Sequence, residues 1–237
     1  MASCSLSQLY HDKAPLFAAL LISSILSFVF YIARVAYSGQ MTFLFLNWNL
    51  FLAWIPLLSA LALWHVDQRN IQLRGLRSAL FGCWLIFLPN SPYLVTDFVH
   101  LVQRHQVPLW YDMLLIFSFA WNGLLLGFVS LWIVQEFIQA RFGSLISQLV
   151  VGFCLIASGF GVYLGRFLRW NSWDFFVDPH SLLADILPRF IDPLAYPRTL
   201  GVTLLYSSFL TVAYITLTLL MRVRWARIDS GESISRR

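Results

Sequence analysis

A small group of polar residues in this apolar sequence could hold an anion or carry out acid–base chemistry. Asp97 and His100 are three residues apart, so on a helix they would project from the same face. Arg166 and Arg169 have the same spacing, and guanidinium groups can bind a phosphate or a carboxylate through paired hydrogen bonds. The candidate ligand-binding residues are Asn90, Asp97, His100, Arg166, Arg169 and Asp174.

Asp97 and His100 are also the candidate catalytic residues, because a carboxylate and an imidazole could act as base and acid. Two side chains of ligand type are too few to predict a metal site, and we expect neither a metal nor a cofactor. The sequence contains no nucleophile elbow, phosphate-binding loop, dinucleotide-binding glycine pattern or HExxH zinc motif. Whether the chain is an enzyme is therefore left open by its motifs.

The composition is that of a membrane protein rather than a soluble domain. Hydrophobic residues make up 59% of the chain and charged residues 11%, and the mean hydropathy is +0.72. We predict an all-α polytopic bundle, one integral membrane domain over residues 1–237, with the lipid bilayer as its partner. Its six predicted spans are residues 15–37, 41–64, 78–102, 110–137, 145–167 and 199–221. An amphipathic surface segment at 181–191 and a basic tail at 222–237 complete the expected organisation.

The third span contains a helix-breaking motif, Pro89-Asn90-Ser91-Pro92. From Ala79 to Pro89 a helix would rise about 15 Å, roughly half of a ~30 Å hydrocarbon core. We therefore predict that the third helix is broken from Pro89 to Pro92, near the middle of the membrane. Ser91 is the expected N-cap and Pro92 the first residue of a new half-helix, whose free N–H groups would attract an anion.

The fifth span supplies the arginines that could face this break. Arg166 lies 21 residues after Leu145, about 31 Å along a helix, which places it at the outer membrane boundary. Arg169 should follow one turn later on the same face. Gly161 and Gly165 form a small-xxx-small pattern that favours close helix contact. At the end of the first span, Arg34 is expected to reach the membrane surface.

The distribution of positive charge predicts the orientation. With six spans and the N-terminus inside, ten of the 16 Lys and Arg residues are cytoplasmic. These are Lys13, Arg69, Arg74, Arg77, Arg141, Arg222, Arg224, Arg227, Arg236 and Arg237. We therefore predict a multi-pass protein of the plasma (inner) membrane with both termini in the cytoplasm. The net charge of +5 is explained by this topology, and no nucleic-acid partner is expected.

Three sequence blocks, at residues 49–56, 88–97 and 163–174, resemble the domain-of-unknown-function 1361 family of polytopic bacterial membrane proteins. The resemblance extends from the second span to the sixth. It implies a polytopic membrane fold and directs attention to the same polar residues. It implies no activity, because that family has no assigned biochemistry.

The favoured function is an outward-facing polar site between the third and fifth spans. This site would bind an anionic small molecule or a lipid headgroup, for transport or for sensing. In one alternative the chain is a structural or assembly subunit of a membrane complex with an unidentified partner. Asp97 would then only pair with Arg166 or Arg169 to hold two helices together. In a second alternative the protein is a membrane-embedded hydrolase or transferase that uses Asp97 and His100.

Overall fold

A computed structural model describes residues 6–69, 74–104 and 106–234, with side chains for 14–69, 74–104 and 106–220. The predicted all-α class is confirmed, because these residues form helices and no β-strand. Six helical stretches are long and apolar enough to cross a membrane: Ala14–Ser38, Leu44–Gln68, Arg74–His100, Leu109–Phe142, Ser144–Leu168 and Pro197–Leu220. The chain is therefore a multi-pass membrane protein.

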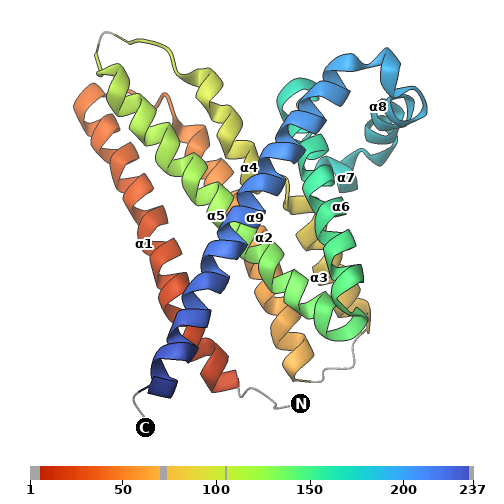
Figure 1. The fold of residues 1–237 in the computed structure, drawn as a ribbon. Coiled ribbons are helices and arrows are strands. Elements are labelled where there is room, and N and C mark those ends of the chain that lie inside the picture. The colour runs from red at the N-terminus through yellow and green to blue at the C-terminus, as the bar shows by residue number, and fades with distance from the viewer. Residues whose placement is uncertain (1–5, 70–73, 105, 235–237) are drawn as a thin grey trace.

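The fourth span is the centre of the bundle. This helix, α5 (Leu109–Phe142), is the most buried span and runs obliquely through the middle of Figure 1. It packs against α2 (Leu44–Gln68) and α6 (Ser144–Tyr163), while α1 (Leu6–Ser38) and α9 (Pro197–Ile234) are the least buried. The start of α1 and the end of α9 lie on the same side of the bundle (Figure 1).

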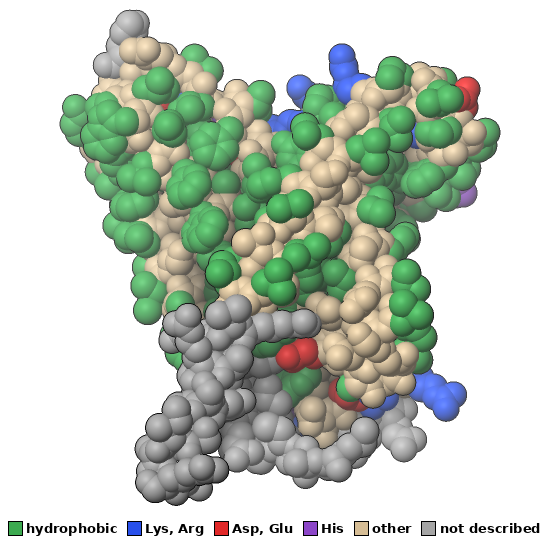
Figure 2. All heavy atoms as spheres, in the orientation of Figure 1, with side chains coloured by type: hydrophobic (Ala, Val, Ile, Leu, Met, Phe, Trp, Pro, Cys, Tyr) green, Lys and Arg blue, Asp and Glu red, His purple; other side chains and the backbone are tan. Residues whose placement is uncertain are grey.

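The outer surface is that of a membrane-embedded bundle. In Figure 2, hydrophobic side chains cover the middle of the visible face, and Lys and Arg side chains gather at its upper and lower margins. The predicted basic tail continues the last span, since α9 extends to Ile234. Its final residues, 235–237, and the side chains of 221–234 lie outside the described part of the chain.

The third span is interrupted at the predicted position. Helix α3 (Arg74–Phe87) is followed by a four-residue helix, α4 (Asn90–Tyr93), and by a 3-10 helix, η1 (Leu94–His100). The predicted half-helix start is wrong. The Ser91 N–H bonds back to the Leu88 carbonyl at 3.1 Å, and the Tyr93 N–H bonds back to Pro89 at 3.1 Å.

The prolines do not expose a helix end because their fixed φ suits a helical path. Pro89 has φ −62° and ψ −21°, both helical, so the chain passes through the interruption as tight turns. Ser91 does not cap the new turn. Its hydroxyl donates instead to the Ala53 carbonyl of α2, at 3.4 Å. No long half-helix with free N–H groups results.

Glycines of the neighbouring helices allow the interrupted segment to pack closely against them. A Cβ atom added at Gly123 of α5 would lie 2.5 Å from the Ser91 carbonyl oxygen. One added at Gly161 of α6 would lie 2.5 Å from Cβ of Pro89. The third span therefore contacts α5 and α6 at backbone distance, and Gly161 packs on it as the small-xxx-small pattern predicts.

The connection between the fifth and sixth spans turns back toward the third span. The fifth span ends in a π-helical turn, η2 (Leu164–Leu168), and Arg169 then adopts a left-handed conformation with φ 62°. This reversal brings Ser172 onto the third span, where its hydroxyl donates to the Ile86 carbonyl at 3.1 Å. Asn90 in turn donates to the Ser172 hydroxyl at 2.7 Å.

The amphipathic segment 181–191 lies within α8 (Pro179–Ile191), which follows the short helix α7 (Asp174–Val177) and precedes the 3-10 turn η3 (Pro193–Ala195). Asp178 caps α8 by accepting the N–H of Ser181 at 3.2 Å. Its exposed hydrophobic side chains are Leu183, Leu187, Phe190 and Ile191. In Figure 1, α8 lies beside the upper ends of α6 and α9. An amphipathic helix in this position is suited to the membrane interface.

Candidate functional site

Asp97 and Arg166 form an ion pair that joins the third and fifth spans. Arg166 Nη2 donates to Asp97 Oδ1 at 2.5 Å, and Asn49 Nδ2 of the second span donates to Asp97 Oδ2 at 2.9 Å. Arg166 also donates to Thr96 Oγ1 from Nε at 2.8 Å, and its Nη1 lies 3.1 Å from His100 Nε2. We call these five residues the Asp97–Arg166 cluster.

Two non-α turns give the cluster its geometry. A 3-10 helix has three residues per turn, so η1 places Asp97 directly below His100. The π-helical turn of η2 presents Arg166 to both of them, with its guanidinium over the Tyr93 ring at 4.7 Å. A guanidinium only donates, so Arg166 can hydrogen-bond to His100 only where Nε2 of the imidazole carries no proton.

The polar groups of this cluster satisfy one another. Both Asp97 oxygens accept hydrogen bonds, its side chain is 1% exposed, and all three nitrogens of Arg166 have partners. Arg166 itself is 16% exposed. An enclosed carboxylate with both oxygens engaged is poorly placed to take a proton from a substrate. The arrangement favours a positioning role, in which the ion pair holds η1 against the fifth span.

The remaining predicted site residues lie outside this cluster. Arg169 is exposed, and the expectation that it shares a face with Arg166 is wrong because the π turn and the left-handed residue end the helix between them. Asp174 accepts from the backbone N–H of Asn171 at 2.7 Å and stabilises its own turn. Asn90 donates to Ser172 and to the Phe87 carbonyl.

A pocket of about 500 Å³ adjoins the cluster. It lies between the second, third and fifth spans, with α7 and α8 on its remaining side. One stripe of α6 and η2 forms a wall: Phe153, Ala157, Phe160, Gly161, Leu164 and Gly165. The pocket is mostly apolar, and its lining side chains with polar groups are Trp48, Asn49, Asn90, Tyr93, Trp170, Asn171 and Ser172.

The cluster and the pocket share residues. Asn49 lines the pocket while it donates to Asp97, and Tyr93 lines it while it lies under Arg166. Asn90 belongs to the pocket and not to the cluster. The sequence did not identify Asn49 as part of the site, because a membrane asparagine more often contacts a neighbouring helix, and here it does both.

A second buried ion pair was not predicted. Arg34 Nε donates to Asp112 Oδ1 at 2.7 Å, and its Nη2 donates to Oδ2 at 3.3 Å. Arg34 is 1% exposed, so the prediction that it reaches the membrane surface is wrong. Arg104 approaches the same carboxylate at 3.5 Å, and the guanidiniums of Arg34 and Arg104 lie 4.6 and 4.9 Å from the ring centre of Phe43. The sequence signal for this pair was Asp112, an acidic residue near the start of the fourth span, at a membrane depth similar to that of Arg34.

No group of three or more His, Cys, Asp or Glu residues in the described ranges is placed to hold a metal ion.

Comparison with known proteins gives a family and no activity. The family model described as "Protein of unknown function (DUF1361)" matches residues 48–213, from within the second span to within the sixth. No curated protein matches the chain, and no solved structure matches it.

Proposed function

Because the chain belongs to the DUF1361 family, whose description assigns no activity, we propose its function from the geometry alone. We propose that it binds an anionic membrane amphiphile between the third and fifth spans, as the binding step of transport or sensing. The observation that carries the proposal is the pocket of about 500 Å³ that meets the Asp97–Arg166 cluster at Asn49. Its volume is within the usual range for small-molecule sites.

The apolar lining suits a hydrocarbon chain. From Phe153 to Gly165 the wall rises about 18 Å, close to the thickness of one leaflet's hydrocarbon region. Phe153 is exposed at one end of this wall, and two further lining residues, Phe175 of α7 and Phe190 of α8, are also exposed. A chain could therefore enter sideways from the bilayer and lie along α6.

The polar residues suit a headgroup. Asn171 and Ser172 line the pocket just after the left-handed residue Arg169, whose side chain is exposed. Amide and hydroxyl groups can hydrogen-bond to ester or phosphate oxygens, and an exposed guanidinium favours an anion. Asn171 and Ser172 follow the C-terminal end of the fifth span. The positive-inside rule assigns that end to the outer face of the membrane. The proposal therefore places the pocket in the outer leaflet of the plasma membrane, with both termini in the cytoplasm.

The Asp97–Arg166 ion pair then shapes the site without lining the pocket. It holds η1, and with it Tyr93, against the fifth span. This interpretation joins two sequence expectations, the helix-holding ion pair and the lipid site.

Filling the pocket should weaken lipid binding. We expect Ala157→Phe to weaken the binding of oleoyl-lysophosphatidylglycerol at least about tenfold, because the new ring would occupy space that the chain needs. Native mass spectrometry of the full-length protein in detergent measures the bound lipid.

Ile156→Phe is the matched control. Ile156 is the adjacent residue on α6, is 57% exposed, and does not line the pocket, so this variant should bind like the parent. Equal binding by the parent and by Ala157→Phe, or no binding by the parent, would contradict the proposal.

A further inference from the structure

On the basis of the function proposed above, we propose that the headgroup of the bound amphiphile carries hydroxyl groups, as glycerol and sugars do, beside its negative charge. Two asparagines that line the pocket indicate this chemistry, Asn49 of α2 and Asn90 of α4. An asparagine amide has a donating end, the NH2 group, and an accepting end, the carbonyl oxygen. The end that the protein leaves free determines which group of a ligand it can bind.

Both amides are held by their nitrogen atoms. Asn49 Nδ2 donates to Asp97 Oδ2 at 2.9 Å. Asn90 Nδ2 donates to the Phe87 carbonyl at 3.0 Å and to the Ser172 hydroxyl at 2.7 Å. A carboxylate paired with arginine and a backbone carbonyl only accept hydrogen bonds, so the amide nitrogen, and not the oxygen, must face them. The chemistry of these partners therefore fixes the orientation of both amides.

The carbonyl oxygens of the two amides are left free. Among the described residues, no donor bonds to Asn49 Oδ1 or Asn90 Oδ1, and neither oxygen is a buried atom without a partner. Both oxygens are therefore accessible, on side chains that line the pocket. Asn90 uses both of its N–H groups within the protein, so it offers a ligand only an acceptor. A ligand satisfies these oxygens with O–H or N–H donors.

The charge near the pocket favours hydroxyl donors over an ammonium group. The Arg166 guanidinium lies 4.7 Å from the ring centre of Tyr93, which lines the pocket, and Arg169 is exposed two residues before Asn171. No aspartate or glutamate is among the described residues that line the pocket. An ammonium group, such as that of ethanolamine, would be repelled by the guanidiniums and would find no carboxylate. Neutral hydroxyl groups on an anionic headgroup avoid this repulsion.

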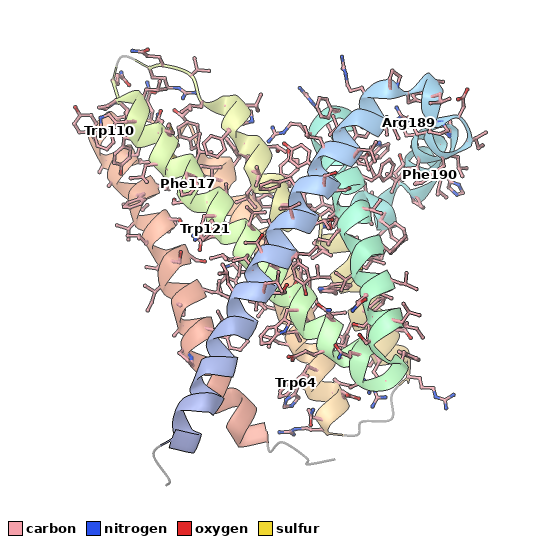
Figure 3. All side chains as sticks on the ribbon, viewed as in Figure 1. Trp64, Trp110, Phe117, Trp121, Arg189 and Phe190 are labelled. Carbon is pink, nitrogen blue, oxygen red and sulfur yellow. The ribbon has the colours of Figure 1, made fainter. Side chains whose placement is uncertain are left out.

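The other elements around the pocket suit the acyl chain. Phe160 of α6 and Phe190 of α8 line the pocket with their ring centres 5.2 Å apart, and Phe190 is labelled in Figure 3. These rings accept no conventional hydrogen bond from a hydroxyl group. The headgroup hydroxyls are therefore expected beside α2 and α4, with the chain along α6 and α8.

Two lipids that differ only in the headgroup hydroxyls test the proposal. They are oleoyl-lysophosphatidylglycerol and its analogue with propanol in place of the headgroup glycerol, which has the same chain and the same charge. Native mass spectrometry of the full-length protein in detergent measures the affinity for each lipid. We expect the parent to bind the glycerol lipid about tenfold more tightly, because only that lipid can donate to the two amide oxygens.

Asn90→Leu should remove most of this preference, because leucine has a similar shape and no acceptor. The ratio of the two affinities is the readout, since a general loss of structure would weaken both lipids alike. Asn49→Leu should change the ratio in the same way and provides a second variant. Asn47→Leu is the matched control: Asn47 lies on α2, donates to the Leu44 carbonyl at 3.4 Å and does not line the pocket, so the parent's preference should be kept.

The outcomes distinguish this proposal from the proposed function. Equal binding of both lipids by the parent overturns the hydroxyl preference and leaves the amphiphile pocket in place. Binding of neither lipid contradicts the proposed function and this proposal with it. A preference that both Asn90→Leu and Asn49→Leu retain also overturns the proposal, because the hydroxyl groups would then bind to other residues.

Discussion

Asp112→Asn will be among the most destabilising substitutions in this protein, lowering the free energy of unfolding by about 3–5 kcal/mol. The substitution leaves Arg34, which is 1% exposed, without the carboxylate that accepts two of its hydrogen bonds. An unpaired cation at this burial loses its hydration and gains no counter-charge. The measurement is reversible unfolding of the purified protein in mixed micelles, with helical content as the signal.

Arg77→Gln is the control, because it removes an ion pair that is not fully buried. Arg77 lies 3.6 Å from Asp67, their side chains are 29% and 23% exposed, and Arg141 also contacts Asp67. We expect a change of only about 0–1 kcal/mol, as for solvent-exposed ion pairs. Adding Arg34→Leu to Asp112→Asn should recover part of the lost stability, because it removes the stranded charge. Equal stability of Asp112→Asn and Arg77→Gln would show that the Arg34–Asp112 pair is not buried as described.

The features predicted correctly depend on local sequence properties. Helix type and the six spans follow from hydropathy and length, which each segment carries in its own residues. The same arithmetic placed Asp97 of the third span and Arg166 of the fifth at a similar depth, and they form an ion pair. Depth along a span can be counted from sequence because helical rise is nearly constant.

The features predicted wrongly depend on how the chain rotates about a helix axis or on which neighbour a side chain meets. A single π turn and a left-handed residue moved Arg169 away from Arg166, and neither has a clear sequence signature. Ser91 could have capped a helix, but its hydroxyl bonds to Ala53 of another span. The pocket has no sequence signal, because it is the space left between side chains from four separate segments.

The two buried ion pairs differ in their position relative to the region that matches the family model. The match begins at residue 48, after the first span, whereas both partners of the Asp97–Arg166 pair lie inside it. The Arg34–Asp112 pair joins the first span to the matched region. The two ion pairs therefore join different parts of the bundle: Asp97–Arg166 links the third and fifth spans, and Arg34–Asp112 links α1 to α5.

Gly161→Leu should disrupt the site and the fold together, with a loss of about 3 kcal/mol or more in the free energy of unfolding. Even the first side-chain carbon at this position would lie 2.5 Å from Pro89 Cβ and 2.6 Å from its Cγ. A proline ring cannot rotate away, so α6 would have to move from the third span. Gly161 also lines the pocket, so binding of oleoyl-lysophosphatidylglycerol should fall in the same variant.

Gly152→Leu separates this effect from the general consequences of replacing a helical glycine. Gly152 lies on the same helix, and a Cβ atom there would have no neighbour within 4 Å. Leucine favours a helix over glycine by up to about 1 kcal/mol, so this variant should be as stable as the parent or slightly more stable. If both variants lose stability equally, α6 and Pro89 are not in contact. A loss confined to Gly161→Leu means that the Pro89 interruption is held in place by the glycine opposite it.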